Sequence, residues 1–139
     1  MKKPDRVVTF RGRFLGIGVL TAIQVINGLT HTFFGLVLVL GTFISVAASS
    51  NFPSVFSFYT LIYGILTLLF TYLLWKGKSL GWIGTVAVAL FVIIADSLTV
   101  LDMLTFLGII KTAAIVEIPY SLATVLYLIQ THIRTKYGI

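Results

Sequence analysis

Long apolar runs alternate with short polar connections along the chain, and four of the runs are long enough to be membrane spans. A helix needs about 20 mostly apolar residues to cross about 30 Å of hydrocarbon. The predicted spans cover residues of about 14–46, 55–75, 80–101 and 107–129. The pattern therefore predicts an all-α integral membrane four-helix bundle, in which residues 1–139 form a single transmembrane domain.

The first run is longer than a perpendicular span requires. At a rise of 1.5 Å per residue, a helix over 14–46 is about 50 Å long, so it must tilt, bend or protrude from the bilayer. A cleaved signal peptide is the alternative, but its apolar region has only about 7–15 residues and ends at a cleavage site of small residues. The small residues Ala47-Ala48-Ser49 come too late for such a site. We therefore expect the first run to remain in the mature protein.

Lysine and arginine are concentrated before the first run, between the second and the third, and after the fourth. In a four-span topology these segments share one side of the membrane, and Lys111 alone lies on the other. The residues on the shared side are Lys2, Lys3, Arg6, Arg11, Arg13, Lys76, Lys78, Arg134 and Lys136. Because cytoplasmic loops are enriched in Lys and Arg, both termini are predicted to be cytoplasmic. Trp75 and Trp82 flank the basic middle turn, at the expected level of the lipid headgroups.

The composition also indicates a membrane protein. The 139 residues are 58% hydrophobic and 10% charged, with a mean hydropathy of +1.08, whereas soluble domains contain about 25% charged residues. The net charge of +6 reflects only four acids rather than many bases, so it does not indicate a nucleic-acid partner. The absence of cysteine from the sequence excludes disulfides, thiolate metal sites and cysteine nucleophiles. We expect a multi-pass protein of the cell membrane.

Polar residues inside the apolar runs mark the candidate site, because ionisable groups within a membrane are costly and usually face the bundle interior. The first span carries Gln24, Asn27 and His31 at spacings of three and four, which places them on one helical face. The third span carries Asp96 and the fourth carries Glu117. Since these two spans are antiparallel, both carboxylates are expected in the outer half of the bilayer or near its middle, close to the depth of His31.

Two interpretations of these five residues are open. They can form a polar cavity that relays protons, holds a divalent cation or binds a polar headgroup. Alternatively, they bond across helices for packing alone, with Lys111 or a partner subunit neutralising the acids. No second histidine lies at ligand spacing from His31, so the sequence does not favour a transition-metal site.

Signatures of common enzymes are missing from the sequence. It contains no Walker-type glycine loop, no GxSxG, no HExxH and no paired histidines for haem, and no cofactor is expected. Aromatic residues crowd the outer end of the second span, where they predict an aromatic belt or a lipid-facing surface, with a quinone or lipid groove as the alternative. These aromatic residues are Phe52, Phe56, Phe58, Tyr59 and Tyr63.

Three short segments carry a resemblance to a known group of proteins. They are Arg13-Phe14-Leu15-Gly16 at the start of the first span, the middle turn from Trp75 to Trp82, and the basic tail from Arg134 to Gly138. With these segments the chain resembles small four-span membrane proteins of unknown function found in archaea and bacteria. Such proteins often open with Arg-Pro-Leu-Gly, from which Phe14 departs. The resemblance implies the topology and brings no activity, so no functional residue is transferred.

Three functional hypotheses follow. The first is a non-catalytic accessory or structural subunit of a larger integral membrane complex, because the chain is small and has few residues outside its predicted spans. The second is a small transporter or a proton or cation conduit that uses His31, Asp96 and Glu117. The third, an enzyme acting on lipid or quinone, has the least support, so no enzymatic activity is expected. The expected partners are membrane lipids and other integral membrane subunits or further copies of this chain, without nucleic acid.

Overall fold

The computed structural model describes residues 9–10, 13–48, 55–103 and 111–139, which are helical almost throughout. The long helices are α1 (Leu15–Ala48), α2 (Val55–Trp75), α3 (Ser79–Val100) and α4 (Lys111–Leu128). Two short elements follow at the C-terminal end, α5 (Thr131–Arg134) and the 3-10 helix η2 (Thr135–Tyr137). Ahead of α1, the two-residue strands β1 (Thr9–Phe10) and β2 (Arg13–Phe14) pair in antiparallel fashion.

The long helices have the length and composition of membrane spans. Three qualify by themselves, namely residues 15–44 of α1, the whole of α2 and the whole of α3. The fourth candidate is α4 together with α5 and η2, which are joined to it across a bend of 71°. The prediction of an all-α, multi-pass membrane bundle is therefore confirmed, with three or four spans among the described residues. The predicted start of the fourth span, at about residue 107, lies outside these residues.

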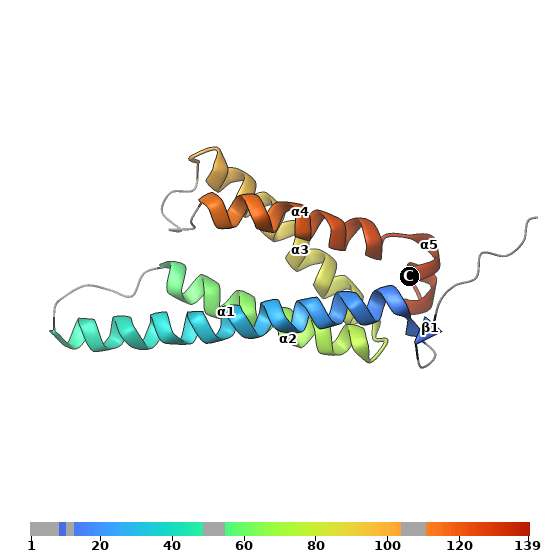
Figure 1. Cartoon of the computed structure of the whole chain (residues 1–139), viewed down its shortest axis with the longest axis horizontal. Coiled ribbons are helices and arrows are strands. Elements are labelled where there is room, and N and C mark those ends of the chain that lie inside the picture. Colours follow the sequence, from blue (N-terminus) through green and yellow to red (C-terminus); the bar gives the residue numbers. More distant parts are fainter. Residues whose placement is uncertain (1–8, 11–12, 49–54, 104–110) are drawn as a thin grey trace, which may run out of the picture.

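The four long helices run side by side with alternating direction (Figure 1). Close packing joins α1 to α2, α2 to α3, and α3 to α4, whereas the backbones of α1 and α4 approach each other much less closely. The 34 residues of α1 form one continuous helix, and this helix extends beyond the others at the end away from the C-terminus (Figure 1). The first predicted span is therefore a single helix longer than the other three, and its tilt in the bilayer or protrusion from it stays a prediction.

Glycines allow the close approach of α1 and α2. A Cβ atom at Gly64 of α2 would collide with the backbone nitrogen of Thr32, and one at Gly35 of α1 would collide with the backbone of Leu61. By contrast, a Cβ atom at Gly18 of α1 would meet no atom within 4 Å. The α1–α2 interface therefore depends on the absence of side chains at Gly35 and Gly64, whereas the position of Gly18 tolerates one.

One end of the bundle gathers the described ends of the chain. The strand β1, the turn between α2 and α3, and the segment α5–η2 all lie there (Figure 1). We call this the basic end, because its described residues include Lys76, Lys78, Arg134 and Lys136. Of the other predicted basic residues on this side, Lys2, Lys3, Arg6 and Arg11 lie outside the described residues. The location of the basic end in the cytoplasm stays a prediction.

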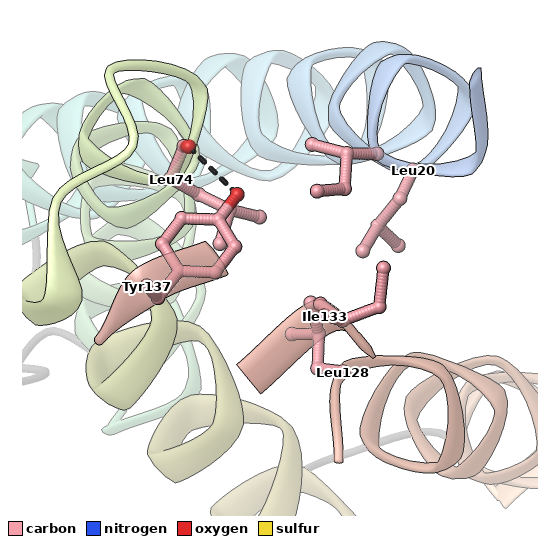
Figure 2. Close-up of a cluster of buried hydrophobic side chains, with 6 residues drawn as sticks. Leu20, Leu74, Leu128, Ile133 and Tyr137 are labelled. Carbon is pink, nitrogen blue, oxygen red and sulfur yellow. Dashed lines mark hydrogen bonds between the residues drawn. The ribbon is translucent and has the colours of Figure 1, made fainter. Parts of the chain in front are cut away.

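An apolar plug closes the bundle at the basic end (Figure 2). It consists of the buried side chains Ile17, Leu20, Leu74, Leu128, Ile133 and Tyr137. The bend after α4 brings Ile133 and Tyr137 back beneath the helices, and the Tyr137 hydroxyl donates a hydrogen bond of 3.0 Å to the backbone carbonyl of Leu74. The C-terminal segment is therefore held against α2 by both packing and a buried hydrogen bond.

Candidate functional site

Small and polar side chains face the interior of the bundle at alternating spacings of three and four residues. On α2 these residues are Ser57, Thr60, Gly64, Thr67 and Thr71, all of them buried. On α4 they are Ala114, Glu117, Ser121 and Thr124. An average spacing of 3.5 keeps one face of a helix turned towards its neighbours along the whole length. Many large apolar residues, among them Ile62, Leu69 and Val116, are exposed on the outer faces. Small and polar side chains therefore form a large part of the bundle interior outside the apolar plug.

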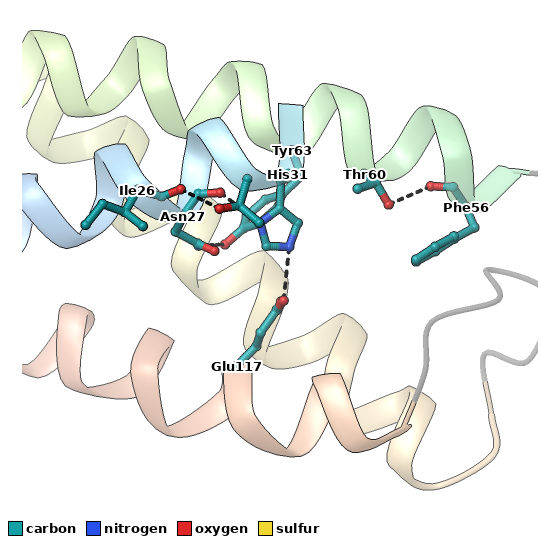
Figure 3. Close-up of polar contacts among 8 residues, drawn as sticks. Ile26, Asn27, His31, Phe56, Thr60, Tyr63 and Glu117 are labelled. Carbon is teal, nitrogen blue, oxygen red and sulfur yellow. Dashed lines mark hydrogen bonds and ion pairs between the residues drawn. The ribbon is translucent and has the colours of Figure 1, made fainter. Parts of the chain in front are cut away.

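The three polar residues predicted to share a face of α1 each contact another helix. Gln24 is buried, and its Oε1 accepts a hydrogen bond of 3.0 Å from the hydroxyl of Thr71. Asn27 donates from Nδ2 to the hydroxyl oxygen of Tyr63 at 3.1 Å. His31 reaches across the bundle from α1 to Glu117 of α4, as Figure 3 shows. This face of α1 is therefore turned towards protein along two helical turns.

His31 and Glu117 form a pair that holds a proton. The Nδ1 atom of His31 lies 3.0 Å from the backbone oxygen of Asn27, and since a carbonyl oxygen only accepts, Nδ1 carries a hydrogen in this contact. The Nε2 atom lies 3.1 Å from Glu117 Oε1. A hydrogen bond at this distance requires one proton between the two atoms, on either the imidazole or the carboxyl group. The pair can thus pass a proton from one residue to the other.

Asp96 has a different environment. Its side chain is 1% exposed, and neither Oδ1 nor Oδ2 has a hydrogen-bond partner among the described residues. Lys111, which the sequence offered as a neutralising base, instead forms an exposed ion pair of 2.7 Å with Asp102. Burial of an unpartnered polar group costs free energy, and the contacts among the described residues give Asp96 no polar partner that offsets this cost.

The two carboxylates and His31 line one central cavity of about 410 Å³ between the helices. Its walls are otherwise mainly apolar and aromatic. The remaining lining residues are Thr30, Phe34, Leu38, Phe56, Tyr59, Thr60 and Ala113. Three of the five predicted site residues therefore meet in the central cavity, while Gln24 and Asn27 line other spaces.

A smaller polar pocket lies in the bundle interior beside Gln24. Its volume is about 20 Å³, which is room for a single water molecule. The hydroxyl groups that line it come from α2, α3 and α4 and belong to Tyr63, Thr67, Thr85, Tyr120, Ser121 and Thr124. Each hydroxyl group both donates and accepts hydrogen bonds. This pocket, unlike the central cavity, is therefore lined mainly by hydroxyl groups.

A lateral groove of about 700 Å³ separates α1 from α4. Its sides are formed by Ile23, Ile26, Asn27 and Thr30 of α1 and by Thr112, Ala113, Val116, Glu117 and Tyr120 of α4. Thr30, Ala113 and Glu117 line both this groove and the central cavity. Glu117 consequently lies where the two spaces meet, which agrees with its side-chain exposure of 25%.

Two tyrosines of the site were missed by the sequence analysis. Tyr63 is 8% exposed and Tyr59 lines the central cavity, so the interpretation as an aromatic belt or lipid-facing surface is wrong for both. Their rings stack at a centroid distance of 6.3 Å, and the ring of Tyr63 meets the edge of His31 at 4.8 Å. For Phe58, which is exposed, this interpretation stays a prediction, and Phe52 lies outside the described residues. Tyr63 lies three residues after Thr60 and four residues before Thr67 on α2. This helical spacing is the sequence feature that indicates an inward-facing Tyr63.

Comparisons with known proteins add no assignment to this geometry. No protein family, no curated protein and no solved structure matches the chain. The similarity to small four-span proteins therefore stays a prediction. Within the described ranges, no group of three His, Asp or Glu side chains is placed to hold a metal ion.

Proposed function

We propose that the protein is a small proton conduit or transporter of the cell membrane, with His31, Asp96 and Glu117 as its proton-carrying groups. The observation that carries the proposal is the buried carboxyl of Asp96, which has no partner among the described residues and lines the central cavity. Ionisable residues within membrane spans that face a cavity commonly belong to ion or proton pathways. The orientation with both termini in the cytoplasm belongs to the same proposal.

The proposed path has three parts. A proton moves between His31 and Glu117 across their contact of 3.1 Å. Asp96 exchanges a proton with this pair across the central cavity, whose volume of about 410 Å³ corresponds to more than ten water molecules at about 30 Å³ each. Hydroxyl groups beside Gln24 continue the path towards the basic end. A proton leaves the path at the basic end when the apolar plug opens.

A purely structural role explains Glu117 better than Asp96. Glu117 has an interhelical partner in His31, as helix packing requires. Asp96 has none among the described residues, and its exposure of 1% leaves no surface that a neighbouring subunit can reach. A role as an accessory subunit of a larger membrane complex is nevertheless supported by one feature, the lateral groove of about 700 Å³ between α1 and α4 with its exposed apolar rims at Ile26 and Val116.

Proton flux in proteoliposomes tests the proposed conduit. The full-length chain is reconstituted with an internal pH-sensitive dye, and a potassium gradient with valinomycin drives proton uptake. We expect flux that is lost in Asp96→Asn and in Glu117→Gln and retained in Asp102→Asn, the matched acid in an exposed ion pair. Flux no greater than in empty vesicles, or equal flux in all variants, contradicts the proposal.

Purification from native membranes tests the accessory function. A subunit seated in the lateral groove is recovered in fixed stoichiometry with the tagged chain and lost when Val116→Trp fills the groove. Ile94→Trp, at an exposed position of α3 outside the groove, is the control and retains the subunit. Recovery of the chain alone removes the support for this second function.

A further inference from the structure

We infer that the central cavity binds a lipophilic organic cation, which enters sideways from the bilayer through the lateral groove and competes with protons for Asp96 and Glu117. The inference rests on the proposed function, because it uses the same two carboxyl groups as proton-exchanging groups. It adds the chemical class of a ligand, the route by which the ligand arrives and the consequence of its binding for the protons.

The charge of the cavity selects a cation. Among the described residues that line it, the groups able to carry a negative charge near neutral pH are Asp96 and Glu117, and no Lys or Arg is present. An anion is repelled by this pair, and a neutral ligand leaves the buried carboxylate of Asp96 without a counter-charge. A positive group in the cavity contacts Glu117 and supplies a counter-charge beside the carboxylate of Asp96, whose oxygen atoms are almost fully covered.

The walls of the cavity select an organic cation of some bulk. Three aromatic rings line it, those of Phe34, Phe56 and Tyr59, together with Leu38. Aromatic faces attract weakly hydrated cations, whereas apolar walls cannot replace the oxygen ligands of a hydrated metal ion. The volume of about 410 Å³ falls within the range of about 300–1,000 Å³ typical of small-molecule sites.

The route to the cavity leads through the membrane. The apolar plug closes the interior at the basic end, whereas the lateral groove shares Glu117 with the cavity. The rims of this groove, formed by Ile26 and Val116, are apolar and 67% and 71% exposed, as suits contact with acyl chains. A ligand on this route dissolves in the bilayer first, then meets Glu117, and finally reaches the deeper Asp96.

Binding of the cation releases protons. A ligand with one positive charge displaces one proton from the group formed by His31, Asp96 and Glu117, so the charge inside the bundle is unchanged. Acidification protonates the carboxylates and the imidazole, and each of these changes weakens cation binding. Among the described residues, the other titratable side chains around these groups are the phenols of Tyr59 and Tyr63 on α2 and of Tyr120 on α4, which carry no charge between pH 5 and 8.

The test is equilibrium binding of tetraphenylphosphonium to the full-length chain in lipid nanodiscs, without any gradient. We expect saturable binding with one site per chain, at least tenfold weaker in Asp96→Asn and in Glu117→Gln and unchanged in Asp102→Asn. Tetraphenylborate, the anion of the same shape, is expected not to bind. Equal affinity for the two probes, or an affinity that neither variant changes, overturns the inference.

The wild-type chain provides a second measurement that does not depend on the folding of variants. Its affinity for tetraphenylphosphonium, which has no titratable proton, is expected to fall at least tenfold between pH 8 and pH 5, with release of protons on binding. An affinity independent of pH overturns the competition with protons. Proton flux without saturable binding overturns the inference and leaves the conduit standing, whereas binding without flux supports the binding site and removes the conduit.

Discussion

The contact between His31 and Glu117 is expected to couple α1 to α4 by about 1–2 kcal/mol, the range for interhelical polar contacts in membranes. The perturbation is a double-mutant cycle of His31→Phe and Glu117→Met. Phenylalanine keeps a ring against Tyr63, which His31 meets edge-on, and methionine keeps most of the length of the glutamate side chain. The two substitutions together therefore remove the polar contact with little change of shape.

The magnitude follows from the distance and the burial. At the observed 3.1 Å, a charged pair in an effective dielectric of about 20 gains about 5 kcal/mol of Coulomb energy. Desolvation offsets most of this gain, because the two side chains are only 20% and 25% exposed. The backbones of α1 and α4 approach each other closely at few positions, so little other packing compensates for the loss of this contact.

The assay is reversible unfolding of the four chains of the cycle in lipid–detergent micelles, which yields the coupling free energy. The pair Lys111–Asp102 serves as a control, because its side chains are 52% and 65% exposed and such pairs contribute at most about 1 kcal/mol, reduced further by salt. A coupling within about 0.3 kcal/mol of zero for His31 and Glu117, which is the additivity of independent sites, refutes the reasoning.

Three further predictions concern stability and topology. Tyr137→Phe removes the buried hydrogen bond that holds the C-terminal segment to α2 and is expected to lower the free energy of unfolding by about 1 kcal/mol; an unchanged value refutes this role. Gly64→Ala is expected to destabilise the chain because its Cβ would collide with α1. The control Gly18→Ala, in open space, stabilises it by up to about 1 kcal/mol, and equal effects of the two changes contradict the account of the α1–α2 interface. Cysteine at exposed Met103 is expected to react with an impermeant reagent in intact cells, and cysteine at Ser79 only after permeabilisation; the opposite pattern reverses the orientation.

The sequence predicts those features that depend on local spacing. The helices follow from apolar runs of sufficient length, and the shared face of Gln24, Asn27 and His31 follows from helical periodicity. The contact between His31 and Glu117, 86 residues apart, does not follow, because it depends on which helices lie opposite each other. The approach of α1 and α4 across a cavity is a property of the whole bundle.

The burial of the individual acids also cannot be predicted from the sequence. Lys111 precedes Glu117 by six residues, yet it pairs with Asp102 because both lie at the end of the bundle opposite the basic end. Asp96 lies within α3 and is buried, whereas Asp102 follows the end of α3 and is exposed. The polar stripe on α2 is visible in the sequence, since the spacing from Ser57 to Thr71 alternates between three and four. Because serine and threonine are common between membrane helices, this spacing alone does not indicate a functional site.

The zero-current voltage across a planar bilayer that contains the protein tests the central claim most directly, since it identifies the ion that carries the charge. One pH unit corresponds to 1.36 kcal/mol and 100 mV to about 2.3 kcal/mol per charge, so a proton pathway shifts this voltage by about 59 mV per pH unit. We expect this shift for the wild-type chain and no protein-dependent current for Asp96→Asn. A voltage that follows a potassium, sodium or chloride gradient instead of the pH gradient contradicts the assignment of the interior as a proton pathway.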